Sequence, residues 1–161
     1  MWIQFQERHQ MAAETKIRSR QLGHLGMPWE EAYGYAQAVR VGDTIYVSGQ
    51  LSHDSSGELV APAPVDASGR VTNFSNMEAQ MRATYANTVK LLAKFGATLD
   101  DVVEETIYVL DVDAAFAVAG KVRKAAYGTS MPGCASTIAG VTRLAFAPQL
   151  VEISFTVVVA N

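Results

Sequence analysis

Glu152 is the side chain in this sequence whose surroundings best suit acid or base chemistry. It alternates with Val151 and Ile153 in an apolar run, so a strand would place it on the face opposite those residues. If another subunit covers that face, the carboxylate loses solvent and its pKa rises, which suits a general acid or base. A glutamate at the rim of the face, held in a salt bridge, is the alternative that this pattern leaves open.

The other candidates for catalysis or metal binding lack the partners that such chemistry requires. Cys134 is the only cysteine, so no disulfide within the chain and no CxxC pair can form. A reactive thiol needs a neighbour that lowers its pKa, and the segment after Pro132-Gly133 offers none, which favours a partly buried, unreactive thiol. His9, His24 and His53 lack metal-ligand spacing, and we expect no metal site.

Two pairs of adjacent acidic residues, Asp100-Asp101 and Glu104-Glu105, do not form a catalytic dyad by themselves. Neighbours on a strand point to opposite faces, so we expect both pairs to be solvated surface charges. The sequence also lacks the motifs GxGxxG, GxxxxGKS/T, GxSxG and HExxH. It therefore has none of the usual signatures of dinucleotide binding, a P-loop, a nucleophile elbow or a zinc protease.

Composition limits the remaining function classes. A chain of 161 residues and 17.3 kDa has the length of one domain, and 49% hydrophobic with 18% charged residues excludes wholesale disorder. The net charge of −3 makes nucleic acid an unlikely partner, because phosphate binding needs a concentrated basic face. The longest apolar stretch, Phe155 to Ala160, is far below the roughly 20 residues of a membrane helix. With one cysteine, we expect a cytoplasmic protein with no membrane contact.

The elements that must position Glu152 begin with a hairpin and a long helix. We expect residues 1–30 to be an N-terminal arm and 31–161 to be the domain. Strands are predicted over Tyr35 to Val41 and Thr44 to Ser48, because the Gly42-Asp43 pair between them suits a tight turn. Ser75 to Glu78 reads as a capping box that starts a helix ending at Gly96.

The second half of the chain predicts three more strands and one more helix. Asp111 or Asp113 should cap the helix and Gly128 should end it, with Lys121, Arg123 and Lys124 on a solvated face. The strands are expected over Val102 to Leu110, Ser136 to Leu144 and Leu150 to Val159. This order predicts an α+β fold in which two helices pack on one face of a mixed sheet. The other face of the last strand is semi-polar, which favours an oligomer.

Several short segments, taken together and in this order, resemble the RidA/YjgF family. The likeness runs from about Tyr33 to Val159. The segments are GYAQAV (34–39), VSGQ (47–50), AQMR (79–82), FGATLDDVV (95–103), YVLD (108–111), VTRL (141–144) and LVEI (150–153). The resemblance implies a chorismate-mutase-like fold, assembled as a homotrimer with clefts between subunits. Well-studied members hydrolyse reactive enamines and imines to a 2-keto acid and ammonia without metal or organic cofactor. Older family labels include ribonuclease and translation inhibitor.

The same resemblance assigns the candidate site. Tyr35 matches the family's cleft tyrosine, Ser48 and Gly49 match a serine-glycine pair after the second strand, and Glu152 matches a glutamate thought to position or activate water. Gly34 and Ala36 replace the proline and serine that flank the family's tyrosine.

One departure changes the expected substrate. Deaminase members carry an arginine that holds the substrate carboxylate. That place falls on Ser136 when counted from VTRL and on Cys134 when counted from Pro132. A neutral donor cannot replace the charge-assisted arginine–carboxylate pair, so a small 2-imino acid should bind poorly. Either the substrate lacks that carboxylate, or the cleft does no deamination, or another cation takes the place of the arginine. The candidates for such a cation are Arg82, Lys121 and Arg143, of which Arg143 is the least favoured because the matching arginine in relatives is usually structural. The cleft asparagine of some members falls on Gly120.

The sequence thus leaves three functions open. The first is a RidA-like enamine or imine deaminase for another substrate, in which Glu152 orients water. In it, Ser136, Thr137 and Cys134 stand where the family carries the arginine that holds the substrate carboxylate. The second is a non-catalytic trimer that binds a small metabolite or regulates a partner. The third, ribonuclease activity, is the least favoured because the chain is acidic and has no paired histidines.

Overall fold

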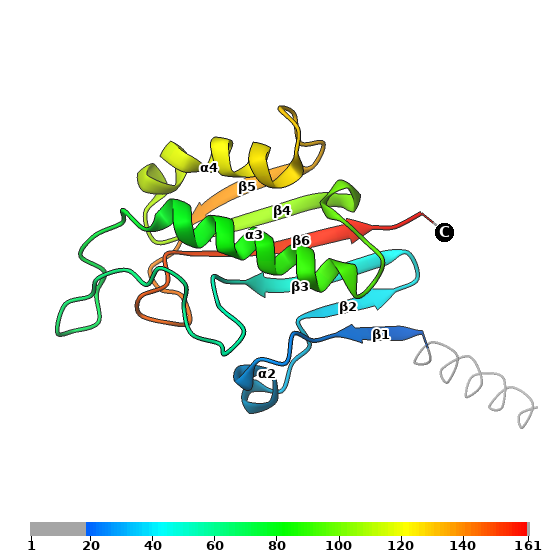
Figure 1. Cartoon of the computed structure of the whole chain (residues 1–161), viewed down its shortest axis with the longest axis horizontal. Helices are drawn as coiled ribbons and strands as arrows, with labels where there is room; N and C mark the ends of the chain where they lie inside the picture. Colours follow the sequence, from blue (N-terminus) through cyan, green and yellow to red (C-terminus); the bar gives the residue numbers. More distant parts are fainter. Residues whose placement is uncertain (1–18, 161) are drawn as a thin grey trace, which may run out of the picture.

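A six-stranded sheet organises the part of the chain that the computed structural model describes, residues 19–160 (Figure 1). The strands lie in the order β1-β2-β3-β6-β4-β5. All neighbouring strands are antiparallel except β4 and β5, which are parallel. Their bounds are β1 Arg20–Gly23, β2 Ala38–Val41, β3 Thr44–Gln50, β4 Val102–Val109, β5 Ala135–Gly140 and β6 Val151–Val158.

Two long helices, α3 (Met77–Ala93) and α4 (Val112–Tyr127), lie side by side on one face of this sheet (Figure 1). A short helix, α2 (Pro28–Tyr33), lies near the β1 end of the sheet, and a 3-10 turn (Leu99–Asp101) precedes β4. The predicted mixed sheet with two helices on one face is confirmed, and α2 adds a third helix.

The ends of α4 follow the sequence signals, whereas the start of α3 does not. Asp111 caps α4 by accepting a hydrogen bond from the Ala114 N–H (2.8 Å), and Gly128 ends it in the left-handed region at φ 65°. The capping box predicted at Ser75 is wrong, because α3 begins after Asn76 without a side-chain cap. The carboxylate of Glu78 turns away instead and pairs with basic side chains of α3 and α4.

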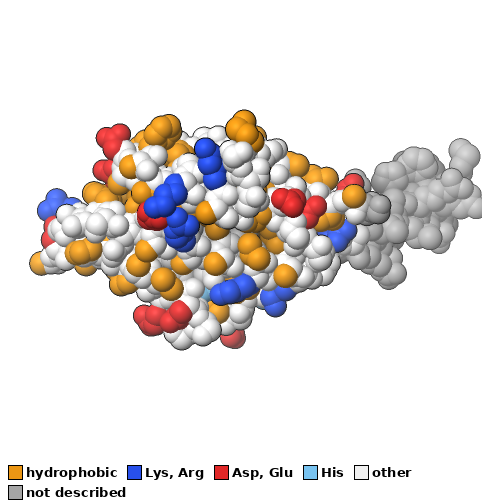
Figure 2. Space-filling view, turned by 45° about the horizontal axis from the view of Figure 1, so that its top comes forward, with side chains coloured by type: hydrophobic (Ala, Val, Ile, Leu, Met, Phe, Trp, Pro, Cys, Tyr) orange, Lys and Arg blue, Asp and Glu red, His pale blue; other side chains and the backbone are white. Residues whose placement is uncertain are grey.

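The core lies between the helices and one face of the sheet. Alternation along β6 puts Val151, Ile153, Phe155 and Val157 inside, as predicted. On the other face, residues such as Ser154 and Thr156 stay partly exposed, because no described element covers them. Figure 2 shows acidic and basic side chains interspersed among hydrophobic ones over the face it presents, without one large field of a single charge.

The segment before residue 31 contributes to the fold. Strand β1 pairs with β2 from Arg20 opposite Val41 to Gly23 opposite Ala38. Gly23 also packs closely against α3 and the turn after it, since a Cβ there would lie 2.6 Å from the ring of Phe95. The last part of the predicted arm therefore lies within the packed unit, and residues 1–18 fall outside the described part of the chain. No helix among the described residues is long and apolar enough to cross a membrane.

Candidate active site

Four of the predicted site residues meet in one cavity of about 550 Å³. It opens where α2, the end of β3, the start of β6 and the loop before β6 come together. The side chains around it are mostly aromatic, with hydroxyl groups and one carboxylate. The lining residues are Trp29, Tyr33, Tyr35, Ser48, Gly49, Leu51, Ala145, Phe146 and Glu152.

A local irregularity between β3 and β6 makes room for Glu152. The register between the two strands shifts between Val47 and Gln50, at the place where Ser48 and Gly49 stand. A Cβ on Gly49 would lie 2.0 Å from Oε1 of Glu152, so any larger residue would displace the carboxylate. Glycine is therefore required at position 49 by close approach and not by backbone strain.

A buried glutamine holds the other oxygen of that carboxylate. Gln149 is fully buried, and its Nε2 donates to Oε2 of Glu152 (3.1 Å) and to the carbonyl of Val151 (3.1 Å). Its Oε1 in turn accepts from the backbone N–H of Phe146 (3.3 Å). Glu152 is thus oriented from one side and keeps Oε1 for another partner. Sequence reasoning missed Gln149, whose only signal is a polar residue immediately before an apolar strand.

Tyr35 is a neutral hydroxyl at ordinary pH. Burial raises its pKa, and the negative charges of Glu30 and Glu152 raise it further, while the indole N–H of Trp29 opposes the shift. Trp29 packs edge-to-face on Phe146, with ring centroids 5.5 Å apart, and on His53 at 5.3 Å. The cavity therefore combines an aromatic wall with the hydroxyls of two tyrosines, Tyr33 and Tyr35.

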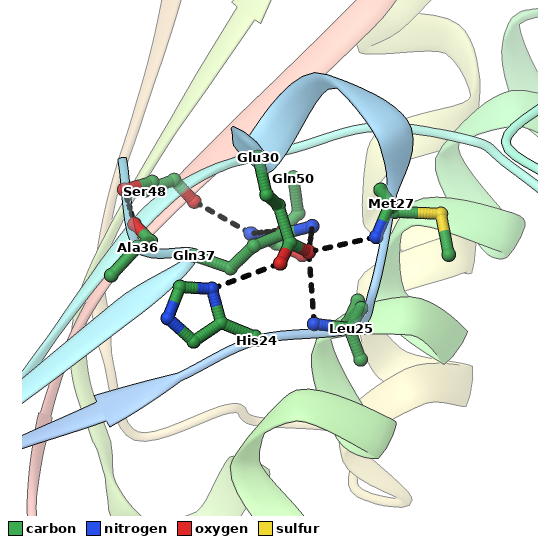
Figure 3. Close-up of polar contacts among 8 residues, drawn as sticks. All are labelled: His24, Leu25, Met27, Glu30, Ala36, Gln37, Ser48 and Gln50. Carbon is green, nitrogen blue, oxygen red and sulfur yellow. Dashed lines mark hydrogen bonds and ion pairs between the residues drawn. The ribbon is translucent and has the colours of Figure 1, made fainter. Parts of the chain in front are cut away.

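A buried carboxylate fixes the segment that carries these aromatic residues (Figure 3). Glu30 on α2 is only 8% exposed, and its Oε1 accepts from the N–H of Leu25 (2.9 Å), the N–H of Met27 (3.2 Å) and Nε2 of Gln37 (2.7 Å). Nδ1 of His24 donates to Oε2 (2.9 Å). Burial alone would raise the pKa of Glu30, but these hydrogen bonds outweigh it and leave the pKa lowered.

The network continues from Glu30 to the β3 side of the cavity (Figure 3). Nε2 of Gln50 donates to Oε1 of Gln37 (2.9 Å) and to the carbonyl of Ser48 (3.0 Å). The hydroxyl of Ser48 donates to the carbonyl of Ala36 (3.0 Å). This chain of hydrogen bonds ties α2 and the following turn to Ser48 and Gly49. It sets the two walls of the cavity relative to each other, and no local sequence pattern predicts it.

The comparisons with known proteins cover most of the part of the chain that the structure describes. A family model described as endoribonuclease L-PSP matches residues 29–159. The chain belongs to this family. Rv2704 of Mycobacterium tuberculosis, described as a member of the YjgF/YER057c/UK114 family, is 30% identical with a TM-score of 0.65, covering 88% of this chain and 100% of that one. RidA of the Antarctic bacterium Psychrobacter sp. is 30% identical with a TM-score of 0.62, covering 78% of this chain and 88% of that one.

A sequence relative agrees with this assignment. A RutC family protein of Pyrococcus abyssi is 32% identical over 99 residues, which are 61% of this chain and 67% of that protein. The resemblance to the RidA/YjgF family that the sequence suggested is confirmed.

Ser136 and Cys134, the two positions at which the family's arginine was expected, do not line the cavity of the same chain. The hydroxyl of Ser136 donates to Oε1 of Glu105 (2.8 Å), and the thiol of Cys134 lies 3.2 Å from the hydroxyl of Tyr127. Both side chains lie on the helix-covered side of β5. Thr137 pairs with Thr106, on the opposite face that Glu152 shares. Of the three residues, Thr137 alone lies on the face of Glu152.

Glu105 is the second centre of polar contacts that sequence reasoning missed. The prediction of a solvated charge is wrong, because Glu105 is 0% exposed. A bulge at Val103 shifts the alternation of β4, so that Val102 and Glu105 both face the core and Glu104 faces out. Four side chains donate to its carboxylate. They are Arg123 and Ser136 on Oε1, and Tyr85 and Tyr127 on Oε2.

The sequence predicted a solvated face for Arg123. This prediction is wrong, because the Arg123 guanidinium pairs with the buried Glu105. Burial would lower the pKa of its guanidinium, but the carboxylate of Glu105 more than compensates and raises it. Burial also raises the pKa of Tyr85, and the charge of Glu105 adds to that effect. The cluster is a charged pair capped by neutral hydroxyls, and it anchors the start of β5 to α3 and α4.

The cavity around Glu152 lacks a positive charge of its own. Among the described residues that line it, Glu152 is the only charged one. Within residues 19–160, no three His, Cys, Asp or Glu side chains gather closely enough to hold a metal ion. The hydroxyl of Ser48 is already donated to Ala36, so the hydroxyls of Tyr33 and Tyr35 are the hydroxyl donors left for a ligand. Such a site suits a neutral or cationic ligand with an apolar or aromatic body.

Proposed function

We propose that this chain is a RidA-like deaminase that hydrolyses an enamine or imine without an adjacent carboxylate. The observation that carries the proposal is the Glu152 carboxylate, oriented by Gln149 inside an aromatic cavity whose lining has no cation. A protonated imine is a cation and is attracted to this carboxylate, whereas a 2-imino acid would bring a second negative charge beside it.

The residues present support a short hydrolytic sequence. Glu152 accepts a proton from water as the water oxygen bonds to the carbon of the protonated imine, which gives a neutral carbinolamine. The protonated Glu152 then donates this proton to the nitrogen, the C–N bond breaks and ammonia leaves, and the remaining hydroxyl loses its proton to give a carbonyl. The sum is one imine and one water giving one carbonyl compound and one ammonia. Tyr35 keeps its proton and donates a hydrogen bond to the nitrogen or the new hydroxyl.

We propose that the cleft is completed in a homotrimer. The sheet face that carries Glu152 is not covered by the described chain, and Tyr46 on that face is 57% exposed. Exposed aromatic area of this kind is typical of an interface. A neighbouring copy would reach the cavity most directly with residues on the face of Thr137. Ser136 and Cys134 are held in the Glu105 cluster.

A second candidate, a non-catalytic trimer that binds a small metabolite, is favoured by one observation. The Ser48 hydroxyl is engaged by Ala36, so the lining offers a ligand only the two tyrosine hydroxyls of Tyr33 and Tyr35 and no hydroxyl from β3. Ribonuclease activity has less support, because the lining has no cation to meet a phosphate.

The test is the rate at which the protein speeds the decay of imines made in situ. An amine oxidase supplies imines without a carboxylate, and an amino-acid oxidase supplies 2-imino acids. Semicarbazide traps what remains. We expect faster decay of the carboxylate-free imines, which is lost in Glu152→Gln and kept in Glu58→Gln, the control at an exposed glutamate in the loop after β3. Thermal stabilisation by the amines without any change in decay would favour the binding trimer.

A further inference from the structure

A second cavity of about 330 Å³ lies on the other side of the loop that precedes β6. It is open to solvent at Arg70, whose side chain is 83% exposed, and it is bordered by the loop before α3 and by the segment after β5, at the end of β4. Phe146 lines both cavities and separates them.

Two guanidinium groups give this cavity a charge opposite to that of the first. Nε of Arg70 donates to Oδ2 of Asp66 (3.3 Å) and to the hydroxyl of Ser68 (3.1 Å), which orients the group. The two Nη atoms of Arg70 have no partner among the described residues, and neither does the guanidinium of Arg143 within residues 19–160. Asp66 balances one of the two charges. The cluster therefore carries a net charge of +1.

Apart from Ser68 and Thr142, the rest of the lining carries no polar side chain. Phe74, Leu110, Leu144 and Phe146 surround the space beside the two arginines. Guanidinium groups recognise carboxylates through paired N–H donors, and an apolar wall favours an organic body over a bare inorganic ion. The volume lies at the lower end of the roughly 300–1,000 Å³ range of small-molecule pockets.

We propose that this second cavity binds a small organic monocarboxylate with an apolar body, the carboxylate facing Arg143 and Arg70. The two cavities then sort ligands by charge. An anion is repelled by Glu152 in the first cavity and attracted to the second cavity, which lies on the other side of Phe146. The inference does not rest on the reaction at Glu152, and its failure would leave that reaction untouched.

Titration calorimetry of the full chain with 3-phenylpropionate tests the proposal. We expect saturable binding, weakened at least fivefold in Arg143→Gln and at least fivefold when the neutral amide of the same acid replaces it. Arg82→Gln is the matched control, because Arg82 is an exposed arginine paired with Glu78 on α3. Glu152→Gln should leave the affinity unchanged. Melting temperatures of all variants check that each is folded, and Arg143→Lys should retain part of the affinity.

Several results would overturn the proposal. Equal affinity of Arg143→Gln and the native chain would remove the arginine from the site. A change in affinity in Glu152→Gln would place the ligand in the first cavity instead. Equal affinity for inorganic phosphate would mean that the arginines attract any anion and that the apolar wall selects nothing. Absence of binding to 3-phenylpropionate at millimolar concentration would also contradict it.

Discussion

Removing the charge of Glu105 should destabilise the fold more than any other single charge-neutralising substitution in the sheet. Glu105→Gln keeps the shape but replaces one carboxylate oxygen with an amide NH₂. If the NH₂ stands at Oε1, Arg123 and Ser136 lose their acceptor, and if it stands at Oε2, Tyr85 and Tyr127 lose theirs. In the first case the Arg123 guanidinium, which can only donate, faces another donor, and in the second the two tyrosine hydroxyls must turn from donating to accepting. In both cases the Arg123 charge loses its counter-ion.

The expected magnitude follows from burial. Breaking a buried ion pair by removing one partner costs about 3–5 kcal/mol. The Arg123 side chain keeps 19% of its exposure, so water screens part of its charge. We therefore expect about 3 kcal/mol, which corresponds to a fall in Tm of roughly 6–12 °C for a chain of this length.

Urea denaturation followed by circular dichroism measures this loss, at one protein concentration because assembly contributes to stability. Glu104→Gln, the exposed neighbour on the same strand, should stay within about 0.5 kcal/mol of the native chain. The double variant Glu105→Gln with Arg123→Gln should be more stable than the sum of its single variants by about 2 kcal/mol. A loss below about 1 kcal/mol in Glu105→Gln, or additive single variants, would refute the reasoning.

Three further predictions concern the cavity wall, the buried Glu30 and α4. Gly49→Ala should reduce imine hydrolysis at least tenfold with little change in Tm, since its Cβ would displace the Glu152 carboxylate while its backbone φ is ordinary; unchanged turnover would contradict this geometry. Because the folded-state pKa of Glu30 lies below its usual value of 4.5, the stability it contributes is complete above that pH and is lost as the pH falls below it. The stability gap between the native chain and Glu30→Gln, measured by urea titration, should therefore shrink below pH 4.5, whereas Glu31→Gln should show no such gap. Gly120→Ala should raise stability by about 1 kcal/mol, because a Cβ there meets no atom within 4 Å and the helix interior disfavours glycine; a lower Tm would show that another chain packs against this position.

The sequence predicted the elements whose signals are local. Alternation in β6, the cap at Asp111 and the left-handed stop at Gly128 are properties of neighbouring residues, and the structure has all three. Strand β1 was not predicted because it is four residues long, and three of them are exposed. Because β1 lacks alternation, it can be recognised only from its pairing with β2.

The residues that line the cavity could be predicted from the sequence, whereas the residues that hold them in place could not. Tyr35, Ser48, Gly49 and Glu152 came from family segments, and they share one cavity. Some supporting contacts join separate elements, such as Gln50 with Gln37, and others join near neighbours, such as Gln149 with Glu152. In neither case does a local pattern predict which polar residue will be buried. The bulge in β4 is a clear case, because one extra residue reversed the facing of Glu105.

The register of β5 shows which of its positions could place an arginine on the face of Glu152. Counting along the sequence pointed to Ser136 and Cys134, but both face the helices and bind within the Glu105 cluster. An arginine introduced at Ser136 would meet Arg123 at a buried carboxylate, so Thr137→Arg is the better way to restore an anchor on the face of Glu152.

The most direct measurement is the rate constant for decay of one carboxylate-free imine with native protein, Glu152→Gln and Glu58→Gln at equal concentration. We expect acceleration by the native chain and by Glu58→Gln, and a loss of at least a hundredfold in Glu152→Gln, the scale of a general base. Equal rates for the native chain and Glu152→Gln, or acceleration only of 2-imino acids, would contradict this expectation.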